Sequence, residues 1–278
     1  MSTQNSPKQA AKQTKDARRE AARAQAEKLR KQQDAREKRS RNILLGVLGA
    51  IVVLVIGVGF VIYQQSQRTL LDAFEGTTPA NSDNRGGIVA GAEGAAGTTT
   101  EGAPVLQVYI DFMCPYCGDF EAANKGDLEE LRAAGDLNVT YHLMSNLDRA
   151  SNGTQFSTRS ANAAATVASE SPEHFVAFVE GVFDNQPSEG SEGLSDAQMA
   201  EIAVGVGVPQ EVADSFSAGT YNEWVGVATR QAQREGVRGT PTVKLDGETV
   251  SGNEVAYNQP GALATWLAEE GVGEGVSE

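Results

Sequence analysis

The two cysteines of this chain, Cys114 and Cys117, constrain its fold more than any other feature. No other cysteine occurs among the 278 residues, and two residues separate the pair. A β-type apolar run from Val105 to Ile110 ends just before them, and a helix-like run from Phe120 to Ala134 follows. A thiol at the start of a helix faces unpaired backbone N–H groups and the positive end of the helix dipole, and both favour the thiolate. The pattern predicts a reactive thiol pair on a strand-to-helix turn.

The place of each cysteine on that turn predicts its role. Cys114 is expected at the exposed end of the turn and is assigned as the attacking thiol. Cys117 follows one helical turn inside, on the same helix face, and is assigned as the resolving thiol. Pro115 falls on the first helical position, where its missing N–H costs nothing, and Tyr116 completes the C-P-Y-C motif.

Two structural uses of the cysteines fit the sequence less well. A structural zinc site needs about four ligands, and the chain offers one cysteine pair and two histidines, His142 and His174. A purely structural disulfide across so short a loop would restrain the unfolded chain very little. The sequence therefore predicts a redox-active disulfide between Cys114 and Cys117, with no metal and no cofactor.

Charge is divided unevenly along the chain, whose formal net charge is −14. Residues 1–41 contain 13 Lys and Arg against 5 Asp and Glu, whereas residues 42–278 contain 10 against 32. Residues 1–42 are expected to form a basic, mostly mobile cytoplasmic tail, because they are too poor in large apolar residues to build a core. Such a tail is attracted to anionic lipid. The acidic remainder would repel nucleic acid, which excludes that class of partner.

An apolar stretch of 21 residues, 43–63, follows the basic tail, and no charge occurs between Arg41 and Arg68. At 1.5 Å per residue it matches a hydrocarbon core of ~30 Å. We expect one uncleaved membrane-spanning helix, because the apolar region of a cleaved signal peptide would be shorter and nearer the N-terminus. The basic side stays in the cytoplasm, so the rest of the chain lies outside the cell. Residues 64–103, rich in small and polar residues from 76 onward, are predicted to be a flexible linker.

Residues 104–270 are predicted to form an α/β domain in the order βαβ, helical insert, ββα. The first strands and the helix between them predict a parallel pair with a right-handed crossover. An Asp246-Gly247 turn between two β-type runs predicts a hairpin. The expected elements are a strand at 105–110, a helix at 120–134, a strand at 137–144, a helical insert at about 145–236, the hairpin and a last helix at 260–269. Residues 271–278 are expected to be a C-terminal tail.

These features together resemble the thioredoxin superfamily and, within it, the DsbA-like thiol–disulfide oxidoreductases. The run D-F-M-C-P-Y-C at 111–117 is similar to the D-F-x-C-P-x-C active site, and G-T-P-T at 239–242 is similar to the cis-proline loop. The resemblance covers about residues 104–270 and implies a thioredoxin-like fold with a helical insert, preceded here by one transmembrane helix. It further implies that Pro241 is cis and lies against the disulfide, and that the backbone of Thr240 pairs with an extended substrate strand.

The chain departs from the family pattern at two positions. Many relatives carry a buried acid six residues before the first cysteine, where this chain has Val108. Some strong oxidants of the family have His between the cysteines, where this chain has Tyr116. A tyrosine cannot supply the cationic hydrogen-bond donor that such a histidine offers to the thiolate.

The resemblance is to members of Gram-positive and actinobacterial type, which carry their own membrane anchor. It implies an enzyme that introduces disulfides into exported proteins with free thiols, is reoxidised by a membrane redox partner and acts as a monomer. A disulfide reductase or isomerase of the same fold is the first alternative. A thioredoxin-like binding module, with the disulfide as a staple, is the second.

Overall fold

The structure is a computed structural model that describes residues 7–66 and 68–273. It divides into two compact units, Met1–Gln67 and Arg68–Glu278, which are described separately. Residues 1–6 of the expected basic tail and 274–278 of the expected C-terminal tail lie outside the described residues.

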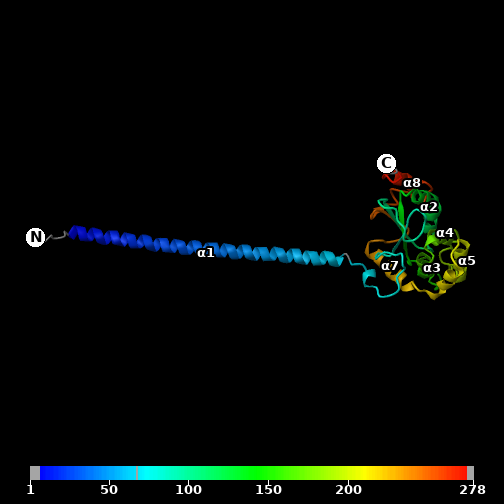
Figure 1. The fold of residues 1–278 in the computed structure, drawn as a ribbon, viewed down its shortest axis with the longest axis horizontal. Coiled ribbons are helices and arrows are strands. Elements are labelled where there is room, and N and C mark those ends of the chain that lie inside the picture. Colours follow the sequence, from blue (N-terminus) through cyan, green and yellow to red (C-terminus); the bar gives the residue numbers. More distant parts are fainter. Residues whose placement is uncertain (1–6, 67, 274–278) are drawn as a thin grey trace. The chain divides into compact units, whose positions relative to one another are not determined.

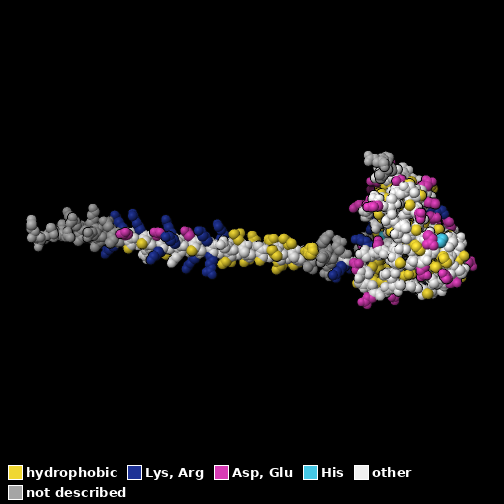
Figure 2. All heavy atoms as spheres, in the orientation of Figure 1, with side chains coloured by type: hydrophobic (Ala, Val, Ile, Leu, Met, Phe, Trp, Pro, Cys, Tyr) yellow, Lys and Arg dark blue, Asp and Glu magenta, His cyan; other side chains and the backbone are white. Residues whose placement is uncertain are grey.

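The first unit is a single helix, α1 (Pro7–Ser66) (Figure 1). Figure 2 shows Lys and Arg along its earlier part and an apolar band after them. Within Arg18–Phe60 this helix is long and apolar enough to cross a membrane, and none of its apolar window is buried against protein. The basic segment from Pro7 onward is part of the same helix, which agrees with the high helix propensity of Ala, Gln, Lys and Arg.

The second unit is organised by a five-stranded sheet in the order β1-β3-β2-β4-β5. The strands are β1 (Gly87–Ala90), β2 (Val105–Ile110), β3 (Asn138–Leu143), β4 (Thr242–Leu245) and β5 (Glu248–Val250). Strands β2 and β3 pair in parallel, and all other neighbours are antiparallel. The predicted βαβ and ββα units are therefore confirmed. The β4–β5 turn places both Asp246 and Gly247 at positive φ, which is why Asp-Gly suits it.

Helices cover both faces of this sheet. They are α2 (Pro115–Ala134), α3 (Phe156–Glu170), α4 (Phe175–Asp184), α5 (Asp196–Gly205), α6 (Gln210–Asp214), α7 (Asn222–Arg234) and α8 (Ala262–Glu269). Successive side chains of a strand point to opposite faces. Thus Val108 packs in the core cluster that includes residues of α2 and α8, whereas Tyr109 packs with Ala232 of α7.

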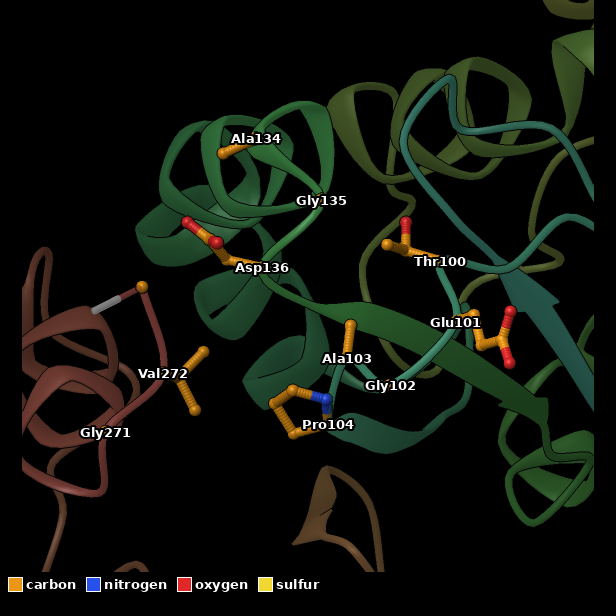
Figure 3. Close-up of a pocket in the computed structure, with 11 residues that line it drawn as sticks. Thr100, Glu101, Gly102, Ala103, Pro104, Ala134, Gly135, Asp136, Gly271 and Val272 are labelled. Atoms are coloured by element: carbon orange, nitrogen blue, oxygen red, sulfur yellow. The ribbon is translucent and has the colours of Figure 1, made fainter. Parts of the chain in front are cut away.

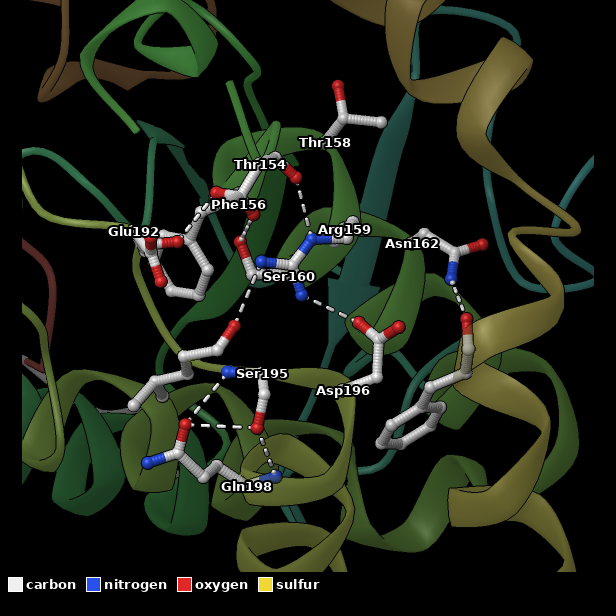
Figure 4. Close-up of polar contacts among 12 residues, drawn as sticks. Thr154, Phe156, Thr158, Arg159, Ser160, Asn162, Glu192, Ser195, Asp196 and Gln198 are labelled. Carbon is white, nitrogen blue, oxygen red and sulfur yellow. Dashed lines mark hydrogen bonds and ion pairs between the residues drawn. The ribbon is translucent and has the colours of Figure 1, made fainter. Parts of the chain in front are cut away.

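The helical insert between β3 and β4 contains α3 to α7, as predicted (Figure 1). Its interior is apolar, with Phe175, Phe178 and Trp224 almost fully buried. Figure 4 shows how α3 is tied to the start of α5: Arg159 donates to Asp196 Oδ1 at 2.7 Å and to backbone carbonyls of neighbouring loops. Ser195 begins α5 with the predicted capping box.

The expected linker is wrong for most of its length, because residues 68–103 pack on the domain. Strand β1 pairs antiparallel with β3, and Ile88 and Ala90 have no exposed surface. Upstream of it, the backbone N–H of Leu70 donates to Gln231 Oε1 at 2.7 Å. A run of four residues is enough for an edge strand when a neighbouring strand offers free backbone groups. The sequence did not indicate this strand, because its four residues are flanked by small and polar residues that are typical of linkers.

Candidate functional site

The two cysteines lie where the sequence predicts, on the turn from β2 into α2. Cys114 is the N-cap of α2, with φ −78° and ψ 116°, and Pro115 occupies the first turn. Both cysteines are free thiols in this structure. Cys117 has no exposed surface, and Cys114 is only 4 % exposed. The expectation that the Cys114 side chain is exposed to solvent is therefore wrong. The carbonyl oxygen of Thr240, in the cis-proline loop, lies against the Cys114 sulfur.

The two thiols differ strongly in acidity. A hydrogen bond from the Cys117 thiol, helped by Thr240 and the backbone N–H groups of Cys117 and Tyr116, lowers the pKa of the Cys114 thiol to about 6. Burial raises the pKa of the Cys117 thiol well above its usual value. At neutral pH the nucleophilic thiolate therefore resides on Cys114. This asymmetry suits a pair in which one sulfur attacks and the other resolves.

The cis-proline loop meets the thiol turn although Cys114 and Thr240 are 126 positions apart in the sequence. The Thr240–Pro241 peptide bond is cis, as the resemblance implies. The Sγ atom of Cys114 lies 3.2 Å from the carbonyl oxygen of Thr240. This contact forms because β4, which begins at Thr242, pairs antiparallel with β2 and brings the loop to the end of β2.

A groove of about 520 Å³ opens beside Cys114. Its walls come from the thiol turn, the loop after β3, α7 and the cis-proline loop. Its lining residues are Cys114, Pro115, Tyr116, Ser145, Asn146, Leu147, Arg149, Glu189, Thr229, Gln233, Arg238, Gly239 and Thr240. Tyr116 is 66 % exposed, which offers a substrate an uncovered aromatic side chain. Cys117 and Pro241 belong to the site but not to this lining.

Hydrogen bonds hold the far wall of the groove in place. The Ser145 N–H donates to Thr229 Oγ1 at 3.1 Å, and Gln233 Nε2 donates to Asn146 Oδ1 at 2.9 Å. These contacts join α7 to the loop after β3. The helical insert, through α7, therefore forms part of the groove wall together with the loop that follows β3.

Asp111, the first residue of the D-F-M-C-P-Y-C motif, is a buried acid to which the sequence alone assigned no role. Its carboxylate accepts hydrogen bonds from Ser157 Oγ at 2.6 Å, the Met113 N–H at 2.9 Å and the Leu147 N–H at 3.0 Å. Burial raises the pKa of Asp111 to about 6. The carboxylate thus joins the thiol turn to α3 and to the groove wall, while the position of the family's usual acid holds the buried Val108.

Gln186 also contacts the thiol turn, although no sequence motif marks it as a site residue. Its Nε2 donates to the carbonyl oxygen of Phe112 at 3.0 Å and to that of Cys114 at 2.8 Å. A Cβ on Gly118 would collide with Gln186 Oε1, so a larger residue there would displace the Gln186 side chain. The loop after α4 therefore clamps the thiol turn from the insert side.

Other features lie away from this site. His142 is buried in β3, stacked on Tyr109 with ring centroids 4.0 Å apart, and His174 contacts Ser171. Figure 3 shows a second cavity, of about 630 Å³, between the segment before β2, the end of α2 and the segment after α8. Its lining carries neither thiol nor imidazole: Thr100, Glu101, Gly102, Ala103, Pro104, Ala134, Gly135, Asp136, Gly271, Val272 and Gly273.

Comparison with known proteins agrees with this geometry. A family model described as "Thioredoxin" matches residues 92–259, more than half of the chain. Among curated proteins, the serine/threonine-protein kinase PknE of Mycobacterium tuberculosis is 29 % identical over 174 residues. That match spans 59 % of this chain but only 29 % of the kinase.

Several solved structures of thiol–disulfide oxidoreductases are similar to this chain over most of their own length. MdbA of Actinomyces oris is 25 % identical with a TM-score of 0.59, covering 71 % of this chain and 94 % of MdbA. DsbG of M. tuberculosis is 31 % identical with a TM-score of 0.54, covering 66 % and 86 %. Reduced DsbA of M. tuberculosis is 32 % identical with a TM-score of 0.52, covering 60 % and 85 %. The chain therefore belongs to the thioredoxin family and, within it, to the DsbA-like thiol–disulfide oxidoreductases.

Proposed function

We propose that this chain is a membrane-anchored, extracytoplasmic oxidase that introduces disulfides into exported proteins through Cys114 and Cys117. The observation that carries the proposal is the unequal thiol pair: a Cys114 with a pKa of about 6 at the groove, backed by a buried Cys117. A stabilised Cys114 thiolate favours the reduced enzyme, and a pair whose reduced form is stable is a strong oxidant. This supports oxidation over the alternative of a reductase or isomerase.

The reaction transfers two electrons from the substrate thiols to the enzyme disulfide. In the oxidised enzyme, a substrate thiolate attacks Sγ of Cys114, forms a mixed disulfide and releases Cys117 as the leaving thiolate. A second substrate thiolate attacks the substrate sulfur that is bonded to Cys114, closes the substrate disulfide and releases Cys114 as a thiolate. One of the two protons lost by the substrate thiols is taken up by Cys117, and the other goes to solvent because Cys114 stays a thiolate at neutral pH. A membrane redox partner then withdraws the two electrons.

Each residue of the site has a proposed part in these steps. Cys114 and Cys117 are the catalytic pair. Pro115 and Tyr116 support the turn, and the backbone of Thr240, beside Pro241, pairs with the extended substrate strand. Cys114 Sγ is 3.2 Å from the Thr240 carbonyl oxygen, so a strand paired there would bring its own cysteine to the reacting sulfur.

Residues 43–63 are proposed to span the membrane, with residues 1–42 in the cytoplasm and the thiol domain outside. The support is the long apolar helix and its basic flank. The enzyme is proposed to act as a monomer. A membrane-impermeant maleimide, applied to intact cells after mild reduction, should label Cys114; labelling only after lysis would overturn the topology.

The decisive experiment traps the mixed disulfide. In a full-length Cys117→Ala variant, Cys114 can still attack a disulfide of an exported protein, but no resolving sulfur releases the mixed disulfide. Adducts with exported proteins should therefore accumulate and be visible on non-reducing gels. A Cys114→Ala/Cys117→Ala variant is the matched control and should show none. If the single variant is folded and its Cys114 reacts with a small maleimide, yet it traps no protein, the proposal is wrong.

The direction of transfer has its own test. Acid quenching of growing cells, followed by alkylation, reports whether the pair rests as disulfide or dithiol. A largely oxidised pair is expected for an oxidase. A largely reduced pair would instead identify a reductase or isomerase.

A further inference from the structure

The charge around the groove is opposite to that of the domain as a whole. All charges of residues 42–278 lie in the second unit, where 32 Asp and Glu outnumber 10 Lys and Arg. Two of these ten basic residues, Arg149 and Arg238, line the groove beside Cys114. Glu189 is the single acid of that lining. The groove is thus a basic site on an acidic surface.

The two groove arginines are free to bind a ligand. Elsewhere in the domain, Arg85, Lys125 and Arg159 are engaged in ion pairs with acids. Arg149 and Arg238 are exposed, and among the described residues neither has a carboxylate within ion-pair distance. Unengaged guanidinium groups at a cleft have all their donors available for a carboxylate.

The backbone of each arginine is held by its neighbours. Asp148, next to Arg149, accepts hydrogen bonds from the Thr158 N–H at 2.9 Å and the Thr158 hydroxyl at 2.6 Å. Val237, next to Arg238, is buried, and its N–H donates to the Ala232 carbonyl at 3.0 Å. The two positive charges are therefore presented from two separate walls, one at the loop after β3 and one at the start of the cis-proline loop.

We propose that Arg149 and Arg238 make this groove selective for substrate segments with acidic residues beside the reacting cysteine. The inference rests on the proposed function, because only a protein thiol that reaches Cys114 has to enter the groove. An extended segment advances about 3.3 Å per residue, so the residues flanking its cysteine pass along the walls that carry the arginines. Carboxylates there gain a charge-assisted contact, and lysines meet repulsion.

The test measures oxidation of dithiol peptides by the oxidised full-length chain in a non-ionic detergent. Three peptides differ only in the residues flanking one cysteine, which are Asp, Ser or Lys. At 0.15 M salt, charges more than about 8 Å away are largely screened, so the groove rather than the acidic domain decides the rate. Each rate is divided by that of the same peptide with 2-hydroxyethyl disulfide, which is neutral and corrects for the peptide's own thiol reactivity.

The Asp peptide is expected to react about tenfold faster than the Lys peptide, from two exposed charge contacts each contributing a few-fold. The ratio should fall to about one in an Arg149→Gln/Arg238→Gln variant and in 1 M salt, where the screening length is about 3 Å. Arg230→Gln, which removes an exposed charge of α7 outside the groove, should leave the ratio unchanged.

Two results separate failure of this inference from failure of the proposed function. Equal rates for the three peptides, or a ratio unchanged in the double variant, would overturn the selectivity while leaving the oxidase in place. Oxidation of dithiothreitol, which is small and neutral, checks the chemistry alone. A chain that oxidises neither dithiothreitol nor any peptide would refute the oxidase and the selectivity together.

Discussion

The buried carboxyl of Asp111 should make the stability of this protein depend on pH in an unusual direction. Its pKa rises from 3.8 in the unfolded chain to about 6 in the folded domain, because burial opposes the charge more than three hydrogen bonds favour it. A folded state with the higher pKa binds the proton more tightly. The Asp111 contribution is therefore neutral below pH 3.8, becomes unfavourable between pH 3.8 and 6, and stays so above pH 6.

The size of this effect follows from the two pKa values. At 1.36 kcal/mol per pKa unit, the ionised carboxylate lowers the free energy of unfolding by about 3 kcal/mol at pH 7.5. Asn has the shape of the protonated carboxyl and cannot ionise. The Asn Nδ2 cannot accept the hydrogen bond from the Leu147 N–H, which gives an Asp111→Asn variant a loss that does not change with pH. On top of that constant, its unfolding free energy should rise relative to the parent by roughly 2–3 kcal/mol between pH 4 and pH 7.5.

Denaturant unfolding of both full-length proteins in detergent, at pH 4, 5, 6 and 7.5, measures this difference. Contributions of all other titrating groups cancel in the comparison. Asp119→Asn removes an equal charge at an exposed position of α2 and is the matched control. Parallel stability curves for the parent and Asp111→Asn across this range would refute the reasoning about the buried acid.

Three further outcomes are expected. Iodoacetamide should alkylate Cys114 of the reduced protein with a rate that rises through about pH 6, while Cys117 stays unmodified in the folded protein; equal labelling of both sulfurs would contradict the assigned acidities. Gln186→Ala should move that midpoint to higher pH, because two carbonyl dipoles at the thiol turn lose their donor; an unchanged profile would limit Gln186 to packing. Ile88→Ala should lower the free energy of unfolding by about 2–5 kcal/mol, because it leaves a cavity in the core. The partly exposed Val204→Ala serves as its control, and equal small losses would show that β1 is not part of the folded domain.

The sequence alone determined the features that depend on neighbours along the chain. The C-P-Y-C turn, the strand before it, the helix after it and the Asp246-Gly247 hairpin all follow from local patterns of apolar residues and turn formers. These patterns report where a strand or helix begins and ends. Together with the Gly239-Thr240-Pro241-Thr242 run, they carried the family resemblance that predicted the fold and proposed Cys114 and Cys117 as the reacting pair.

Only the tertiary structure decided which distant residues meet at the site. Asp111, Gln186 and the two groove arginines come from separate elements, and their hydrogen bonds and charges act through contacts that no local pattern encodes. Residues 87–90 became a strand because β3 offered them a free edge, against the composition of their own segment. Contacts between remote segments depend on how the whole chain packs, so burial, acidity and groove charge emerge only when the domain is assembled.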